Sequence, residues 1–190
     1  IILIENGIDN AKFNIKVEPE SRAAATVAMN YSQQEIKGSK YGLEALMIAK
    51  KTIPDLQVEL FSVNPNPGDL PPWIKFHRNP HNLPEIYNRN AIFVSNSFTE
   101  GFGLVSVESM FCGCALICTD IQGHKEYAFD KETALLVEAG NAQQMADRII
   151  GLINNNQERT AMSYRGNEFV QKFSWDSAIQ KMTRTIESLL

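Results

Sequence analysis

The stretch Thr99-Glu100-Gly101-Phe102-Gly103-Leu104-Val105-Ser106-Val107-Glu108 is the most informative part of this sequence. It follows an apolar, strand-like run at residues 91–95 and opens a helix-like run. The first N–H groups of a helix lack intrahelical partners and carry the positive end of the helix dipole, and glycines let an anion approach the backbone. Gly101 and Gly103 therefore predict a phosphate-binding turn between a strand and a helix.

Glu108 is the second informative residue of this stretch. On a helical wheel it falls within the apolar arc of the expected helix, which is formed by Leu104, Val105, Phe111 and Cys112. Ser106 and Ser109 lie on the opposite, polar side. An unpaired buried carboxylate is costly, so Glu108 is expected either to pair with an internal Arg or Lys or to contact a ligand. It stands roughly 7 Å along the helix from Gly103 at ~1.5 Å per residue, which suits a ribose beside a bound phosphate.

Strand-like and helix-like runs alternate along the whole chain. The strand-like runs are residues 26–29, 58–63, 74–77, 91–95, 115–118 and 134–137. Helical periodicity covers residues 39–51, 83–89, 103–112, 142–154, 157–172 and 175–190. Each crossover between parallel strands needs a connection long enough for a helix. The pattern predicts an α/β fold, a Rossmann-like doubly wound parallel sheet of about six strands with helices on both faces.

The pair Glu100 and Glu108, with seven residues between them and GFGL inside, resembles the paired-glutamate signature of the retaining glycosyltransferases of family 4, which have the two-domain GT-B fold. Four further stretches resemble elements of that family in the same order: the junction motif NGxD…F in residues 4–13, the KG element in residues 36–39, the small-residue turn in residues 109–114 and the F-x-W motif in residues 173–175. The resemblance covers nearly the whole chain.

The resemblance implies the donor-binding, C-terminal half of a GT-B enzyme. Residues 1–14 would form the interdomain junction, residues 15–172 the Rossmann-like donor domain, and residues 173–190 a final helix packing toward the missing N-terminal acceptor-binding domain. That half would use a UDP-, GDP- or dTDP-sugar as donor and need neither a metal nor a cofactor.

The same resemblance assigns roles to individual residues. Glu100 would orient the donor sugar and Lys37 would meet the diphosphate, both as catalytic groups, and Glu108 would hold the ribose. The remaining donor-binding residues would be Gly101, Phe102, Gly103, Leu104 and Val105.

One feature departs from the family pattern, because the family's phosphate-contacting Arg ahead of Lys37 has no counterpart in residues 29–33. Asn30, Tyr31 or Ser32 would have to supply neutral hydrogen bonds, or Lys40 a substitute charge. The resemblance implies that residues 77–80, which follow the third strand-like run, would lie near the nucleotide base, and a plain loop is at least as good an interpretation. His124 is interpreted as a surface histidine, and Phe173 and Trp175 as core anchors of the last helix.

The full protein is expected to transfer a sugar to a polysaccharide or a lipid-linked glycan with retention of anomeric configuration, and this half alone is expected to be inactive. Two other classes stay open. One is a different GT-B enzyme, such as a sugar-nucleotide epimerase or a phosphorylase. The other is a non-catalytic nucleotide-sugar binding module, which the missing Arg favours.

Composition agrees with one globular unit. The 190 residues, 44% of them hydrophobic, suffice for a sizeable core. A net charge of −4 argues against a general nucleic-acid surface. No stretch reaches the ~18 apolar residues of a membrane span, and no signal segment is recognisable, so we expect a soluble protein. Because the sequence does not begin with Met, we expect it to be part of a longer protein.

Three cysteines, Cys112, Cys114 and Cys118, lie in one short stretch. A metal site would need a fourth ligand, and the three histidines are His77, His81 and His124. We expect small buried thiols and no metal. An odd number of unpaired cysteines suits a reducing compartment, so a cytoplasmic location is expected, with peripheral membrane association of the full-length enzyme left open.

Overall fold

In a computed structural model, which describes residues 2 and 4–188, the chain forms one six-stranded sheet in which all strands are parallel. The strands are β1 (Thr26–Asn30), β2 (Gln57–Ser62), β3 (Ile74–Arg78), β4 (Ile92–Ser95), β5 (Ala115–Thr119) and β6 (Ala134–Val137). Their order in the sheet is β3-β2-β1-β4-β5-β6, so the direction of winding reverses between β1 and β4. This topology confirms the predicted Rossmann-like doubly wound fold.

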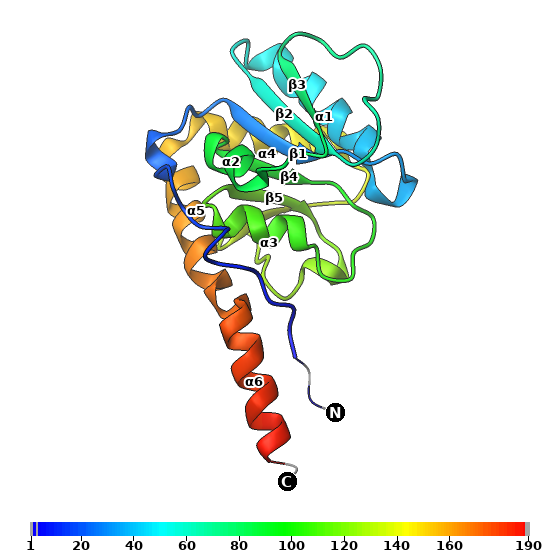
Figure 1. The fold of residues 1–190 in the computed structure, drawn as a ribbon. Helices are drawn as coiled ribbons and strands as arrows, with labels where there is room; N and C mark the ends of the chain where they lie inside the picture. Colours follow the sequence, from blue (N-terminus) through cyan, green and yellow to red (C-terminus); the bar gives the residue numbers. More distant parts are fainter. Residues whose placement is uncertain (1, 3, 189–190) are drawn as a thin grey trace.

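Helices cover both faces of the sheet (Figure 1). They are α1 (Ser39–Thr52), α2 (Leu83–Arg89), α3 (Leu104–Phe111), α4 (Ala142–Asn154), α5 (Asn156–Val170) and α6 (Trp175–Glu187). Short 3-10 turns η1 (Pro19–Ser21), η2 (Glu35–Lys37), η3 (Gln122–His124) and η4 (Gln171–Phe173) complete the elements. None of the described helices is both long and apolar enough to cross a membrane.

Two buried clusters, one on each face, hold the layers together. The cluster on the α1 and α4 face includes Met29, Leu46 and Ile149, and the cluster on the α2 and α3 face includes Phe93 and Met110. Residues that alternate along β1 and β4 enter opposite clusters, as the two-residue period of a strand requires. The central strands are therefore apolar on both sides, which explains their continuous hydrophobic runs.

The last helix projects from the body of the domain, beside residues 4–8 (Figure 1). The two segments meet where Ile8 and Ser174 form an isolated parallel bridge and where Lys181 pairs with Glu5. Phe173 is buried as predicted, but the prediction that Trp175 anchors α6 in the core is wrong. Trp175 lies close to Gly7 but is 56% exposed, because α6 projects from the body of the domain (Figure 1).

The predicted elements match the observed ones to within two residues at each described end. The helix expected at residues 157–172 ends at Val170, where η4 replaces its last turn. Residues 189–190 of the expected final helix lie outside the described residues. The proposed division into residues 1–14, 15–172 and 173–190 stays a prediction.

Candidate functional site

The candidate site lies at the carboxyl edge of the sheet, where the strand order reverses. β1 leads into η2 and α1 on one face, whereas β4 leads into α3 on the other face. Connections that leave neighbouring strands in opposite directions open a crevice between them, and open α/β sheets bind ligands there. All residues assigned to the diphosphate, ribose and sugar of the donor lie in these two connections or on α3.

The backbone from Gly101 to Val105 carries five successive N–H groups without an acceptor. Within the described part of the chain, none of these five groups donates a hydrogen bond. Gly103 caps α3 in the left-handed region, with φ +80°, and a Cβ there would stand 2.4 Å from the hydroxyl oxygen of Tyr127. Only glycine fits this position. The unpaired N–H groups and the dipole of α3 together make the turn suited to an anion.

The side chains of this turn point in different directions. Phe102 packs its ring against Tyr127 and Phe173, with centroids 5.5 and 5.2 Å apart, so it anchors the turn in the core. Leu104, in contrast, is 47% exposed. The turn therefore offers its backbone rather than the Phe102 ring to a ligand.

Lys37 and Glu100 are brought together by the fold although 63 positions separate them. The Lys37 Nζ lies 2.7 Å from Glu100 Oε1, and both side chains are largely buried. Ser97 also donates its hydroxyl to Glu100 Oε1, at 2.7 Å. The two residues predicted to be catalytic thus form one ion pair at the reversal of the sheet, next to the free N–H groups.

Asn96 fixes the backbone that carries Lys37. Its side-chain amide donates to the Lys37 carbonyl oxygen at 2.6 Å, and the Phe98 N–H donates to the Ile36 carbonyl oxygen at 2.8 Å. Gly38 lies so close that a Cβ would stand 2.1 Å from the Asn96 carbonyl oxygen. The connection after β1 is therefore fastened to the connection after β4, and the lysine is held beside the glutamate.

Glu108 stands one helical turn beyond the free N–H groups. Its carboxylate accepts a hydrogen bond from the Tyr87 hydroxyl at 3.2 Å, and no ion pair with Lys or Arg is found among the described residues. Burial raises the pKa of Glu108 to about 7, although the Tyr87 hydrogen bond and the charge of Lys12 act in the opposite direction. The described residues therefore do not support the alternative of an internal ion pair for Glu108. A ligand hydroxyl is a suitable donor to the remaining lone pairs of its carboxylate.

The expected faces of α3 are only partly observed, since Phe111 and Cys112 are buried as predicted but the two serines and Leu104 are not placed as predicted. Ser106 and Ser109 are completely buried, whereas Leu104 is 47% exposed and Val105 is half-buried. The prediction was wrong because α3 is enclosed by the sheet on one side and α5 on another, so the small serines occupy the tight contacts. Glu108 thus lies on the more open face of α3, and the inference that it reaches a ligand no longer rests on a core-facing arc.

The residues considered as substitutes for the missing Arg separate into two groups. Asn30 lines the same small hollow as Lys37 and Glu100. Tyr31, Ser32 and Lys40 line a different, larger cavity on the α1 side. Of the four, Asn30 is the one placed beside the ion pair.

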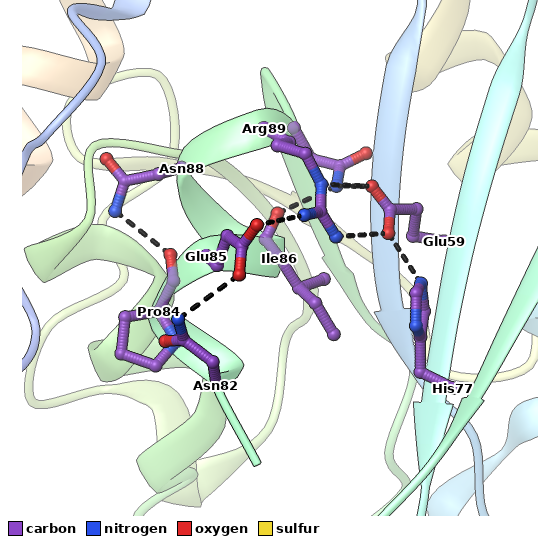
Figure 2. Close-up of polar contacts among 9 residues, drawn as sticks. Glu59, His77, Asn82, Pro84, Glu85, Ile86, Asn88 and Arg89 are labelled. Atoms are coloured by element: carbon purple, nitrogen blue, oxygen red, sulfur yellow. Dashed lines mark hydrogen bonds and ion pairs between the residues drawn. The ribbon is translucent and has the colours of Figure 1, made fainter. Parts of the chain in front are cut away.

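His77 is engaged in an ion-pair network on the α2 side of the sheet (Figure 2). Its Nε2 lies 2.6 Å from Glu59, which also binds the guanidinium of Arg89 through two hydrogen bonds of 3.1 and 2.9 Å. Burial raises the pKa of Glu59, but Arg89 and His77 outweigh it and hold that pKa below its ordinary value. His77 thus has a structural partner, and Arg78, Asn79 and Pro80 remain the positional candidates for the base.

The interpretation of His124 as a surface histidine is wrong, since it is 1% exposed. Its Nδ1 lies 2.8 Å from the Thr119 carbonyl oxygen, and its ring lies beneath Gly103. Burial lowers the pKa of His124, which favours the neutral ring. The histidine was misjudged because η3 folds back under the phosphate turn, a tertiary contact that local sequence does not reveal.

All three cysteines are free and buried, as expected. Burial raises the pKa of Cys114 to about 12 and raises those of Cys112 and Cys118 as well, so their thiols stay protonated. Within residues 2 and 4–188, no group of metal-ligating side chains is found.

Sequence reasoning missed Tyr87, Asn96 and Tyr127, which support the three predicted binding elements. Tyr87 lies on α2 and reaches Glu108 across the α2–α3 contact, and Tyr127 donates to the Gly103 carbonyl oxygen at 3.3 Å. No local pattern marks these residues, because each acts across two separate elements.

Comparison with known proteins agrees with this geometry. A family model described as Glycosyl transferases group 1 matches residues 73–169, which include the turn and α3. The chain belongs to this family. A D-inositol 3-phosphate glycosyltransferase from Arthrobacter sp. is 27% identical over 89% of this chain and 45% of its own length. An uncharacterized glycosyltransferase from Methanocaldococcus jannaschii is 35% identical over 52% of this chain and 28% of its own length. This group 1 chain thus spans less than half of those relatives.

Solved structures show the same fold. The C-terminal domain of a glycosyl transferase group 1 family protein from Francisella tularensis superposes with a TM-score of 0.76, 24% identity and coverage of 89% of this chain and all of that domain. Anabaena HepE in complex with UDP-glucose superposes with a TM-score of 0.82, 19% identity and coverage of 98% of this chain and 57% of HepE. The group 1 chain therefore has the fold of one half of a GT-B glycosyltransferase.

Proposed function

We propose that this chain is the donor-binding half of a family 4 glycosyltransferase that transfers a sugar from a nucleotide-sugar to a glycan acceptor with retention of anomeric configuration. The observation that carries the proposal is the run of unpaired N–H groups from Gly101 to Val105 beside the Lys37–Glu100 ion pair. HepE, a structural neighbour, is described in complex with UDP-glucose, and the match of fold supports a donor of that class.

In this proposal the diphosphate of the donor rests on the free N–H groups at the start of α3. Negative charge develops on the diphosphate as the bond to the anomeric carbon breaks, and preorganised N–H dipoles and an ammonium stabilise it. Lys37 would then exchange its partner Glu100 for a phosphate oxygen. Because these groups already supply positive charge to the leaving group, we propose that transfer needs no metal ion.

The two glutamates would have different tasks. Glu100, once its ammonium partner turns to the diphosphate, would accept hydrogen bonds from hydroxyls of the donor sugar and so orient it. Glu108, beside the Tyr87 hydroxyl, would accept hydrogen bonds from the ribose. Each glutamate thus recognises a different part of one donor.

The rest of the reaction would depend on the other half of the enzyme. The acceptor pocket and the remaining catalytic groups would lie on an N-terminal domain across the crevice. A cytoplasmic protein, with the full-length enzyme at the membrane surface, fits an acceptor that is a polysaccharide or a lipid-linked glycan.

Calorimetry on the chain with UDP-, GDP- and dTDP-sugars tests the proposal. One nucleotide class should bind, and Lys37→Ala should weaken it, whereas Lys51→Ala, which removes an exposed lysine at the far end of α1, should not. Failure of all three classes to bind would refute the proposal. Transfer by the full-length protein to an acceptor separates it from a binding module and from an epimerase.

A further inference from the structure

A cavity of about 900 Å³ lies beside the donor site, beyond the carboxyl end of β1 and on the α1 side of the sheet. Its wall includes Tyr31, Gln33, Gln34, Tyr41, Pro67 and Phe98. No residue assigned to the donor lines it. A cavity of this volume is within the usual range for small-molecule sites.

The aromatic walls of this cavity are held in place by other rings. Phe98 meets Tyr41 edge to face, with centroids 5.5 Å apart and planes at 75°. Tyr31 meets Phe76 in the same way at 6.2 Å and 77°. Phe98 nevertheless remains 40% exposed. A ligand would thus meet ring surfaces that are already ordered, which lowers the entropy cost of binding.

Four polar side chains of the cavity are uncommitted, whereas the hydroxyls of Ser32 and Ser39 accept backbone hydrogen bonds. Among the residues that the structure describes, no hydrogen bond involves the hydroxyls of Tyr31 and Tyr41 or the side-chain amides of Gln33 and Gln34. Amides and hydroxyls can both donate and accept hydrogen bonds. They match a ligand whose own groups do both, which is the property of sugar hydroxyls.

The charged residues of the cavity do not favour a strongly charged ligand. Glu35 and Lys40 are its two charged residues, they are opposite in sign, and both are exposed. A diphosphate in this cavity would face one lysine and one glutamate. The neighbouring turn offers it five free N–H groups and Lys37 instead. The cavity therefore suits a neutral ligand.

We propose that this cavity binds a neutral saccharide unit of the acceptor glycan. The inference rests on the proposed function, because it uses the position of the reacting groups. Ile36 and Gly38, on either side of Lys37, belong to the cavity wall, and Phe98 precedes Glu100 by two residues. A glycan held against Phe98 and Tyr41 would thus extend toward the Lys37–Glu100 pair, and units beyond the reacting sugar would contribute to acceptor choice.

Amide NMR of the 190-residue chain tests the proposal, with methyl α-glucoside, methyl α-mannoside, methyl α-galactoside and methyl N-acetyl-α-glucosaminide as probes. At least one glycoside should shift the amides of Gln33, Gln34, Tyr41 and Phe98 with a dissociation constant in the range of about 1 mM or weaker. Absence of such shifts with all four glycosides would overturn the proposal. Larger shifts of these amides with UDP than with any glycoside would overturn it too.

Variants locate the binding surface. Phe98→Ala should weaken the glycoside about five- to tenfold, because a stacking ring is lost. Phe129→Ala is the matched control, since Phe129 is 38% exposed and meets Phe169 edge to face, away from the cavity, and it should bind the glycoside as the wild type does. Gln34→Ala should weaken glycoside binding about threefold. Because Gln34 is exposed, this variant should fold normally, and it tests the cavity even where Phe98→Ala disturbs the fold. Equal affinities for the wild type and both cavity variants would overturn the proposal.

Nucleotide titrations in parallel separate the two claims. Phe98→Ala should bind the nucleoside diphosphate as tightly as the wild type. Nucleotide binding without glycoside binding would overturn this inference alone. Glycoside binding without binding of UDP, GDP or dTDP would refute the proposed function and the acceptor assignment with it.

Discussion

Replacing Glu108 by Gln should make the domain more stable at alkaline pH while weakening its binding of ribonucleotides. Burial raises the pKa of Glu108 to about 7 in the folded chain, against an ordinary value of 4.5. The folded state therefore holds a proton on Glu108 between pH 4.5 and 7 that the unfolded state has lost. Stability falls as the pH rises through this window, and the full penalty applies above pH 7.

The size of the penalty follows from the two pKa values. At 1.36 kcal/mol for each pH unit, the difference between about 7 and 4.5 corresponds to at most about 3 kcal/mol. Glu108 is only partly buried, so solvent reduces this figure to about 1–3 kcal/mol. Gln carries no charge and keeps an oxygen that can accept from Tyr87, so Glu108→Gln should gain this amount at pH 8 and almost nothing at pH 4.5.

Urea unfolding of the wild type and the variant at pH 5 and pH 8 measures the effect. Glu44→Gln is the matched control, because Glu44 is exposed on α1. The free energy of unfolding of this variant should equal that of the wild type at pH 5 and at pH 8. A Glu108→Gln protein that is no more stable than the wild type at pH 8 would refute the reasoning. The same variant should bind UDP, GDP or dTDP more weakly, and unchanged affinity would make Glu108 a structural residue only.

Three further predictions concern the turn and the ion pair. Lys37→Ala should weaken a nucleoside diphosphate more than the nucleoside, by about 1–3 kcal/mol, and calorimetry showing equal losses would contradict a phosphate contact. Glu100→Gln should leave free diphosphate binding intact and selectively reduce sugar-nucleotide binding, so an equal loss with both ligands would refute the sugar-orienting role. Gly103→Ala should destabilise the fold by about 1–2 kcal/mol or more in urea unfolding, because φ is +80° and the new Cβ meets Tyr127, whereas Gly101→Ala, with open space, should cost less. Equal stabilities for the two glycine variants would show that the backbone at Gly103 is not constrained.

The sheet and its winding were predictable because each central strand is apolar on both faces and each crossover carries helical periodicity. The phosphate turn was predictable for a related reason: a strand, two glycines and a helix occur within a few residues. These features are local, and the structure places the turn at the reversal between β1 and β4, where such a sheet binds ligands.

The supporting contacts of the site were not predictable from local patterns. Ser106 is a polar residue, which predicts an exposed position, but it is buried where α3 meets its neighbours. His124 is predicted to be exposed, but it lies beneath Gly103. The Lys37–Glu100 ion pair joins two connections that are far apart in the sequence. Hydrophobic periodicity reflects one element at a time, so it does not reveal which face of a helix is open when neighbours cover it on two sides.

A nucleoside diphosphate bound at the start of α3 can be detected by amide NMR of the chain during titration with UDP, GDP and dTDP. At least one of these should shift the amides of residues 101–105 and of Lys37 more than any others, and Lys37→Ala should reduce those shifts. Shifts confined to other surfaces, or none at residues 101–105 with any of the three nucleotides, would contradict the account.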